Sequence, residues 1–279
     1  MTLTPLADLL VRATARGGGL GAFNVILLEH AEALAEAAER AETPVVLQIS
    51  QNCVRYHRAL APIALATLAV AQASTAPVAV HLDHADDVAL VKEAVDLGFG
   101  SVMFDGSRLA YAANVAATRE VVQHCRERGV AVEAELGEVG GKDGVHAAGA
   151  RTDPAEAAAF VAATGVDALA VAVGTSHAMR TRDASVDHDL VGRLRAAVPV
   201  PLVLHGSSGV PDGEITRAVA NGITKVNVST HLNAAFTGAV RAELDADPDL
   251  VDPRRYVAAG REAVTAEAEH LLAVLHAGA

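Results

Sequence analysis

The sequence predicts a TIM barrel, a closed ring of eight parallel strands with helices outside. Three observations support this prediction. Eight short apolar runs alternate with helical patterns along 279 residues, and regular alternation favours a parallel sheet covered by helices. A chain of this length commonly forms one α/β barrel. The alternative, an open doubly wound sheet, is weakened because no Gly-x-Gly-x-x-Gly sequence separates the first strand from its helix. We therefore expect residues 1–279 to form a single domain.

The expected strands are short runs of mostly Val, Leu and Ala, the composition of strands that are covered on both faces. In order, they are residues 21–25, 44–50, 77–84, 101–107, 130–137, 168–177, 201–209 and 225–230. Between them lie helical patterns at 29–41, 86–98, 114–129, 153–165 and 212–222, several of which end in Gly, a common helix stop. Thr4-Pro5 is expected to be the N-cap and first residue of an opening helix. From about residue 231 the chain reads as helical throughout and should pack over the barrel.

The composition excludes several classes of partner. The formal net charge is −12 and no Lys/Arg-rich run occurs, so nucleic acid is not expected as a partner. No apolar run reaches the roughly 18 residues that span a bilayer, and the N-terminus lacks the pattern of a signal peptide. The two cysteines, Cys53 and Cys125, are far apart and suggest no disulfide framework. We expect a cytoplasmic protein without membrane attachment.

Polar residues follow six of the eight expected strands, where TIM barrels place their chemistry. His84, His177 and His205 follow the third, sixth and seventh strands. Three neutral imidazoles are good zinc ligands and leave one coordination position for a substrate. Any single histidine is better explained as a hydrogen-bonded strand end, but the three together favour a metal site. His81 has the same facing as Asp83 and is expected to be a hydrogen-bonding core group.

The remaining histidines carry no such pattern. Seven are expected to make ordinary hydrogen bonds to neighbours, and His146, in a polar loop, stays open; the seven are His30, His57, His124, His188, His231, His270 and His276.

Asp105 and Glu135 lie at neighbouring strand ends and have two alternative roles. They could hold a second divalent ion, or they could accept the outer N–H of a metal-binding imidazole and so orient it. Glu133, with the same facing as Glu135, is expected to be a buried partner for a nearby His or Arg.

The segments His205-Gly-Ser-Ser-Gly and Asn227-Val-Ser-Thr predict an anion site. Gly permits close approach of the backbone, and Ser or Thr at a helix start leaves N–H groups for an anion. Strands 7 and 8 supply both segments, where TIM barrels frequently bind phosphate. The alternative is ordinary loop and N-cap chemistry.

With these segments in view, the chain resembles the class II, metal-dependent ketose-bisphosphate aldolases nearly end to end. The resemblance is sharpest at VAVHLDHA (78–85), VEAELGEVGG (132–141), GTSH (174–177), HGSSG (205–209) and KVNVST (225–230). It is to the shorter branch, which includes fructose- and tagatose-bisphosphate aldolases. Members are usually homodimers or homotetramers, so the resemblance implies a homo-oligomer acting on a phosphorylated sugar.

The resemblance implies roles for individual residues. His84, His177 and His205 match the catalytic Zn²⁺ ligands, Asp105 and Glu135 match a second metal position, and Asp83 matches the acid/base at the substrate C4 hydroxyl. The segments that hold dihydroxyacetone phosphate match Gly206, Ser207, Ser208, Asn227, Val228, Ser229 and Thr230. Asn24 and Ser50, at the ends of the first two strands, are placed in the same substrate site.

Three departures from the family pattern bear on substrate more than on reaction class. The usual loop glutamate is replaced around Lys142-Asp143-Gly144, so Asp143 is the expected loop acid/base and Glu138 its rival. Ala178 follows the second metal histidine in place of Gly, and Arg180 or Arg182 could replace a usual lysine. Residues 51–59 replace a Gly-rich loop.

Three rival functions remain. Metal-assisted hydrolysis is disfavoured by the phosphate-like loops. A Schiff-base aldolase needs a lysine in the barrel, and Lys225 is expected near the wrong end of strand 8. A zinc- and sugar-phosphate-binding barrel without turnover is kept open by the Asp143 departure. Fructose 1,6-bisphosphate is the preferred substrate, with tagatose 1,6-bisphosphate or a deoxy-ketose phosphate as alternatives.

Overall fold

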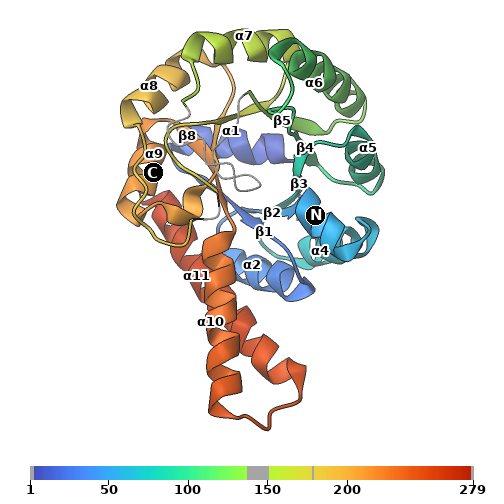
Figure 1. The fold of residues 1–279 in the computed structure, drawn as a ribbon, viewed down its shortest axis with the longest axis vertical. Coiled ribbons are helices and arrows are strands. Elements are labelled where there is room, and N and C mark those ends of the chain that lie inside the picture. The colour runs from blue at the N-terminus through green and yellow to red at the C-terminus, as the bar shows by residue number, and fades with distance from the viewer. Residues whose placement is uncertain (1–2, 137–150, 178, 278–279) are drawn as a thin grey trace.

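The protein forms a closed barrel of parallel strands (Figure 1). The computed structural model describes residues 3–136, 151–177 and 179–277. In these residues eight strands pair in chain order, and β1 closes the ring by pairing with β8. They are β1 Leu20–Asn24, β2 Val45–Ser50, β3 Val78–Ala85, β4 Ser101–Phe104, β5 Ala131–Glu135, β6 Ala168–Val171, β7 Leu202–Leu204 and β8 Ile223–Val228. The predicted TIM barrel is confirmed.

Helices surround the barrel, and their ends follow local sequence signals. They are α2 Leu28–Arg40, α3 Gln51–His57, α4 Ala61–Ala73, α5 Val88–Asp96, α6 Tyr111–Arg126, α7 Pro154–Thr164, α8 His188–Ala197 and α9 Asp212–Asn221. In α7, Asp153 caps the first turn by accepting from the backbone N–H groups of Ala155 and Glu156, and Gly165 ends the helix in a left-handed conformation. Among the described residues, no helix is long and apolar enough to cross a bilayer.

The first helix, α1 (Leu6–Arg16), closes the barrel at the amino ends of the strands. Its buried face, Leu6, Leu9 and Leu10, packs with inward-facing apolar residues of the strands. The predicted cap is off by one residue, because Pro5 takes the N-cap position and the helix starts at Leu6. Gly17, with φ 70°, ends the helix.

The barrel interior is arranged in layers because side chains alternate along each strand. The layer next to α1 is apolar and includes Val46, Ala79 and Met103. Two residues further along, buried polar side chains follow: Gln48, His81, Glu133 and Lys225. The next inward-facing positions, at the carboxyl ends, hold Asn24, Asp83, Glu135, His205 and Asn227. Polarity therefore rises toward one end, which positions the candidate site there.

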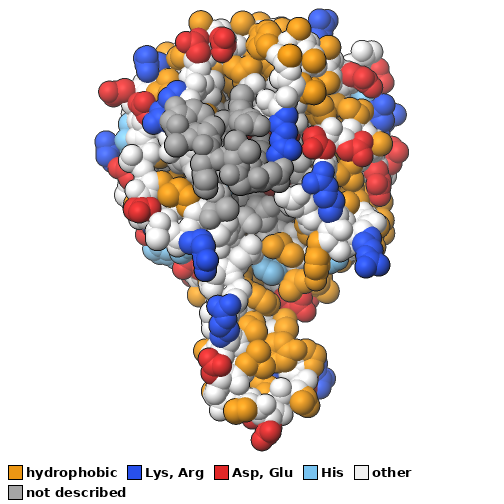
Figure 2. Space-filling view, viewed as in Figure 1, with side chains coloured by type: hydrophobic (Ala, Val, Ile, Leu, Met, Phe, Trp, Pro, Cys, Tyr) orange, Lys and Arg blue, Asp and Glu red, His pale blue; other side chains and the backbone are white. Residues whose placement is uncertain are grey.

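The two last helices, α10 (Thr230–Ala246) and α11 (Pro253–His276), form a hairpin that extends from the barrel (Figure 1). The last turns of α11 pack over the barrel as predicted, burying Leu271, Leu272 and Leu275 against β1, α2 and α9. The tip projects away, and Val251 there is 88% exposed. Figure 2 shows hydrophobic side chains at this end, while acidic and basic side chains are interspersed over the barrel.

Several element boundaries differ from the expectations. β6 and β7 end after four and three residues, and residues 207–209 form a 3₁₀ turn instead of continuing the strand. Helices α3, α4 and α8 have no counterpart among the predicted elements. In α4 the reason is composition: its sequence, APIALATLAVAQA, is apolar on nearly every side and shows no helical period.

Candidate active site

A cavity of about 310 Å³ opens at the carboxyl ends of the strands. It brings together thirteen of the residues expected in the site: Asn24, Ser50, Asp83, His84, Asp105, His177, His205, Gly206, Ser207, Ser208, Asn227, Ser229 and Thr230. Asp143 and Glu138 lie outside the described residues, as do His146 and Ala178.

Asp83 and His84 both line the cavity although consecutive residues of a regular strand face opposite sides. The register of β3 against β4 shifts between Leu82 and Ala85, and His84 has a φ of 49°. A bulge with a left-handed residue re-aims a side chain. This local irregularity turns the His84 imidazole into the mouth beside Asp83.

The imidazoles of His84, His177 and His205 meet in the cavity. Ring centroids lie 4.6 Å apart for His84 and His205, 5.0 Å for His84 and His177, and 5.7 Å for His177 and His205. One nitrogen from each ring lies within 4.8 Å of the other two, the spacing of a metal-binding group. Nε2 of His84 and Nδ1 of His205 lie 2.9 Å apart.

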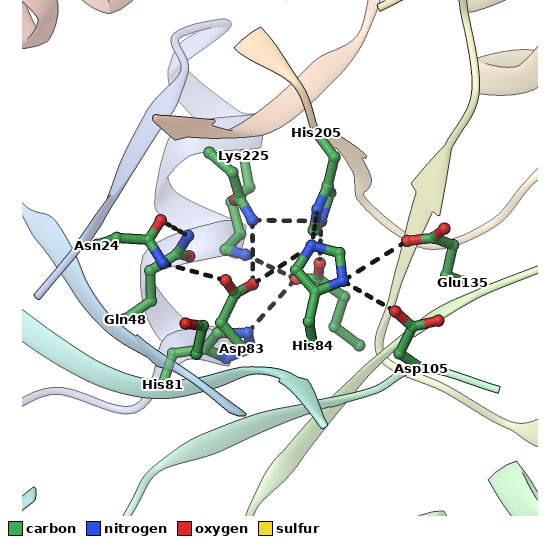
Figure 3. Close-up of polar contacts among 12 residues, drawn as sticks. Asn24, Gln48, His81, Asp83, His84, Asp105, Glu135, His205 and Lys225 are labelled. Atoms are coloured by element: carbon green, nitrogen blue, oxygen red, sulfur yellow. Dashed lines mark hydrogen bonds and ion pairs between the residues drawn. The ribbon is translucent and has the colours of Figure 1, made fainter. Parts of the chain in front are cut away.

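Carboxylates on the outer side of two rings determine which nitrogens face inward. Asp105 Oδ2 lies 3.0 Å from Nδ1 of His84 (Figure 3). Glu133 Oε1 lies 2.9 Å from Nε2 of His205. An ionised carboxylate only accepts hydrogen bonds, so each of these nitrogens carries the ring hydrogen of a neutral imidazole. The remaining nitrogens then point their lone pairs at one another across the 2.9 Å gap. A cation between them resolves this repulsion, so the donor set fits Zn²⁺.

Asp83 is held by two side-chain amides. Asn24 donates to Oδ2 at 3.2 Å, and Asn227 donates to Oδ1 at 3.4 Å. Asp83 is 3% exposed and opens onto the cavity. These contacts present a carboxylate in fixed orientation 4.0 Å from Nε2 of His84.

A second group of metal-capable atoms shares His84 with the first. Asp105 and Glu135 offer oxygens near Nδ1 of His84, at 3.0 and 4.0 Å. Asp105 is also fixed by the backbone N–H and hydroxyl of Ser107, which donate to Oδ1 at 3.2 and 2.5 Å. Nδ1 of His84 donates to Asp105 in this geometry, and it could bind a second ion only by giving up that hydrogen.

The loops after β7 and β8 are linked to each other beside the cavity. Ser207 Oγ donates to the backbone carbonyl of Asn227 at 2.8 Å, and Ser229 N–H donates to Ser208 Oγ at 3.3 Å. Gly206 has a φ of 67°, and a Cβ there would lie 2.6 Å from the backbone of Ser176. Helix α10 starts at Thr230, so its positive end faces the cavity.

The position of Lys225 in strand β8 differs from the position that the sequence predicted. β8 begins at Ile223, so Lys225 is its third residue and its side chain is fully buried in the barrel interior. Its Nζ donates to Glu133 Oε2 at 2.8 Å, and Lys225 does not line the cavity. The burial of Lys225 and its ion pair with Glu133 therefore argue against a Schiff-base aldolase. The expected reason, a position near the start of strand β8, was wrong.

His81 and Glu133 behave as the sequence predicts. His81 Nδ1 lies 2.9 Å from Ser101 Oγ, and its ring is fully buried beneath the site. Burial, and next the Lys225 charge, hold the pKa of His81 well below its usual value. Glu133 pairs with His205, as expected of a histidine partner, and with Lys225.

Two other expectations can be compared with the structure. The Val228 side chain is buried in the core between sheet and helices, because it alternates with the inward-facing Asn227, so it does not line the cavity. Arg182 donates to the Val210 carbonyl and to Asp212, and neither it nor Arg180 lines the cavity. The seven histidines expected to be ordinary each contact a neighbour.

Several cavity residues were missed from the sequence. Gln48 donates to Asn24 Oδ1 at 2.8 Å and is fully buried. The sequence did contain a sign of this role, because Gln48 is polar in an otherwise apolar strand and lies two residues before Ser50. Arg55, on α3, and Arg108, after β4, add cationic groups to the cavity wall, but no motif marks them.

Comparison with known proteins agrees with this geometry. A family described as "Fructose-bisphosphate aldolase class-II" matches residues 4–278. The chain is 38% identical over 268 residues to fructose-bisphosphate aldolase of Staphylococcus aureus strain Mu50, covering 95% of this chain and 94% of that protein. It is 38% identical over 270 residues to the enzyme of the same name from Geobacillus stearothermophilus, with the same coverage.

A solved structure is also similar over nearly the full length. The YdjI aldolase of Escherichia coli K12 superposes with a TM-score of 0.86 at 32% identity, covering 98% of this chain and 97% of that one. The matched residues, the barrel and the full-length relatives agree, and the chain belongs to the class II fructose-bisphosphate aldolase family.

Proposed function

We propose that this aldolase cleaves fructose 1,6-bisphosphate reversibly to dihydroxyacetone phosphate and glyceraldehyde 3-phosphate. The observation that carries this proposal is the placement of the Asp83 carboxylate 4.0 Å from His84, a member of the three-imidazole group, in one cavity. A retro-aldol cleavage needs a base at the C4 hydroxyl and an electron sink at the C2 carbonyl. Class II aldolases are generally metal-dependent, and these residues supply a base and a metal-binding group side by side.

His84, His177 and His205 would hold Zn²⁺. The bound ion would supply a Lewis acid that draws electrons from the substrate carbonyl. Neutral imidazoles leave its charge intact, and the inward lone pairs of His84 and His205 fit it. For Asp105 and Glu135 we favour the orienting role, because Asp105 sits at hydrogen-bond distance from Nδ1 of His84. A second divalent ion at this group remains the alternative.

Asp83 would take the proton from the C4 hydroxyl during cleavage and return it during aldol addition. The amides of Asn24 and Asn227 hold both carboxylate oxygens toward the cavity. General acid–base groups of this kind contribute about 10²- to 10⁴-fold to rate.

The phosphate of the dihydroxyacetone half would bind between the loops after β7 and β8. Gly206, Ser208 and Ser229 line this part of the cavity, and α10 starts there. Backbone N–H groups and a helix N-terminus recognise phosphate through hydrogen bonds and the helix dipole. Such an anchor positions the reacting carbons against Asp83 and the metal site.

The proposal also includes a loop acid/base and the state of the protein in the cell. Asp143 would protonate or deprotonate C3 of dihydroxyacetone phosphate, with Glu138 as the rival. We also keep the single domain, the homo-oligomer and the cytoplasmic location as predictions.

A turnover screen tests the substrate. Fructose 1,6-bisphosphate, tagatose 1,6-bisphosphate and ketose monophosphates would be compared by enzymatic trapping of dihydroxyacetone phosphate. The proposal predicts the highest kcat/KM for fructose 1,6-bisphosphate. A higher value for another ketose would replace the substrate, and no product from any of them with zinc bound would favour the non-catalytic barrel.

A further inference from the structure

A fully buried ion pair lies directly beneath the three-imidazole group. Lys225 Nζ donates to Glu133 Oε2 at 2.8 Å, and both side chains are 0% exposed. Neither residue lines the cavity, so neither meets the substrate. Burying two charges costs desolvation free energy that pairing and hydrogen bonds only offset. Such a pair is therefore weak evidence for stability, and a functional role is the better explanation.

The second oxygen of Glu133 connects this pair to the metal-binding group. Oε1 lies 2.9 Å from Nε2 of His205, so one carboxylate accepts from Lys225 with one oxygen and from the imidazole with the other. Nδ1 of the same ring faces His84 at 2.9 Å. The three side chains form a buried line from Lys225 through Glu133 to the metal side of His205.

A competing contact could reverse the His205 tautomer. The side-chain nitrogen of Asn227 lies 3.2 Å from Nε2 of His205, and it could donate there only if Nε2 carried no hydrogen. The contact to Glu133 is shorter and charge-assisted, so it is the stronger one. Asn227 also has the Asp83 carboxylate as an acceptor.

From this geometry we propose that Lys225 and Glu133 are positioning residues that fix His205 as the Nε2–H tautomer, with Nδ1 presented to the metal. Lys225 acts through Glu133: its ammonium donates to Oε2 and so holds the carboxylate with Oε1 turned to accept from His205. The inference rests on the proposed zinc site, but its readouts are metal affinity and tautomer, which do not depend on which sugar is cleaved.

Glu133→Gln tests the tautomer because the amide has one acceptor oxygen for two donors. The Lys225 ammonium should take that oxygen, which turns the amide NH₂ toward Nε2 of His205. The ring must then accept at Nε2 and carry its hydrogen on Nδ1, where it blocks the metal. We expect zinc affinity, measured by chelator competition, to fall roughly 10- to 100-fold.

The double variant Glu133→Gln/Lys225→Met should reverse this loss. Without the ammonium, the amide oxygen is released to accept from His205, so zinc affinity should return close to the wild-type value. Glu133→Leu/Lys225→Met is the matched comparison, since it is equally neutral but has no acceptor, and it should bind zinc as weakly as Glu133→Gln. The surface pair Lys92–Glu120 provides the control, with Glu120→Gln and Lys92→Met expected to change nothing.

The proposal is overturned if Glu133→Gln binds zinc like the wild type, or if the Gln/Met and Leu/Met double variants bind zinc equally well. Should Glu133→Gln not fold, the two double variants still decide the question. A direct readout on the unmodified chain is ¹⁵N–¹H correlation of the histidine rings in zinc-free protein, with His205→Asn to identify the signal. The Nε2–H tautomer at His205 is expected, and an Nδ1–H tautomer would contradict the proposal.

Discussion

The side-chain amide of Asn24 donates a hydrogen bond to Oδ2 of Asp83 at 3.2 Å. Gln48 sets the direction of this bond. It donates to Oδ1 of Asn24 at 2.8 Å, which turns the NH₂ group of Asn24 toward Asp83. All three side chains are at most 8% exposed. The candidate base is thus held by a fixed chain of amides from β1 and β2.

Asp83→Ala should retain zinc and lose most carbon–carbon cleavage. The three imidazoles remain in this variant, whereas a general base contributes about 10²- to 10⁴-fold. The measurement is zinc content together with kcat for the cleavage reaction. Asp86→Ala is the matched control, because Asp86 lines the same cavity but bonds to Gln51. Loss of zinc along with activity would make Asp83 a ligand or a structural support.

Gly206→Ala should destabilise the protein and disturb the phosphate loops. Gly206 has a positive φ of 67°, and the new Cβ would lie 2.6 Å from the backbone of Ser176, which cannot move aside cheaply. We expect a loss of roughly 1–3 kcal/mol, measured from the shift in the thermal unfolding midpoint.

Gly192→Ala is the control for this change. Gly192 lies inside α8 with nothing within 4 Å of a Cβ, so alanine should stabilise by about 0.5–1 kcal/mol. If both substitutions shifted the unfolding midpoint in the same direction, the close approach at Gly206 would not be the cause.

Stability should fall as the pH drops from about 6.5 to about 4, in part because of His30. Burial lowers the pKa of His30 to about 4 from 6.5, and the ring packs on Phe236 at a centroid distance of 4.9 Å. In this window the unfolded chain binds the proton and the folded chain does not, so acid favours unfolding. The full loss in the free energy of unfolding is on the order of 3 kcal/mol. It is reached when the pH falls below the folded-state pKa of His30.

His30→Gln isolates this contribution. The midpoint of urea unfolding would be followed against pH for both proteins, and the variant should lose less stability on acidification. Parallel curves for the two proteins would show that His30 does not titrate in this way.

Solvent-deuterium exchange into C3 of dihydroxyacetone phosphate tests the loop acid/base. Asp143→Ala should slow the exchange while zinc content and phosphate affinity stay nearly unchanged, because other strands hold the ion and phosphate. Asp143→Glu should retain or raise activity, since it restores a longer carboxylate. Glu138→Ala is run beside it: a selective loss there would transfer the role to Glu138.

The barrel was predictable because alternation of strands and helices and the polar strand ends are both properties of the local sequence. The strand alternation also placed His81 and Asp83 on one face correctly. Regular alternation along β3 would turn His84 outward. His84 reaches the site only because the strand register shifts and because its own φ is 49°, in the left-handed region. Such a bulge depends on pairing with β4, which the sequence of β3 alone does not contain.

Lys225 and Arg55 show why other parts were missed. Lys225 was placed at the start of strand 8 because the apolar run begins after it, whereas pairing with Leu202 of β7 starts the strand at Ile223, two residues earlier. Arg55 reaches the cavity from α3, a seven-residue helix too short to show a clear period. Both depend on contacts between segments distant in sequence.

The most direct test of the account is cleavage of fructose 1,6-bisphosphate by metal-stripped protein as Zn²⁺ is added back. Product would be followed by trapping dihydroxyacetone phosphate, and bound zinc would be measured in the same samples. The account predicts no cleavage after stripping and recovery that follows zinc occupancy of the three-histidine group. Full activity in the presence of chelator, with inactivation by borohydride when substrate is bound, would contradict it and indicate a Schiff base.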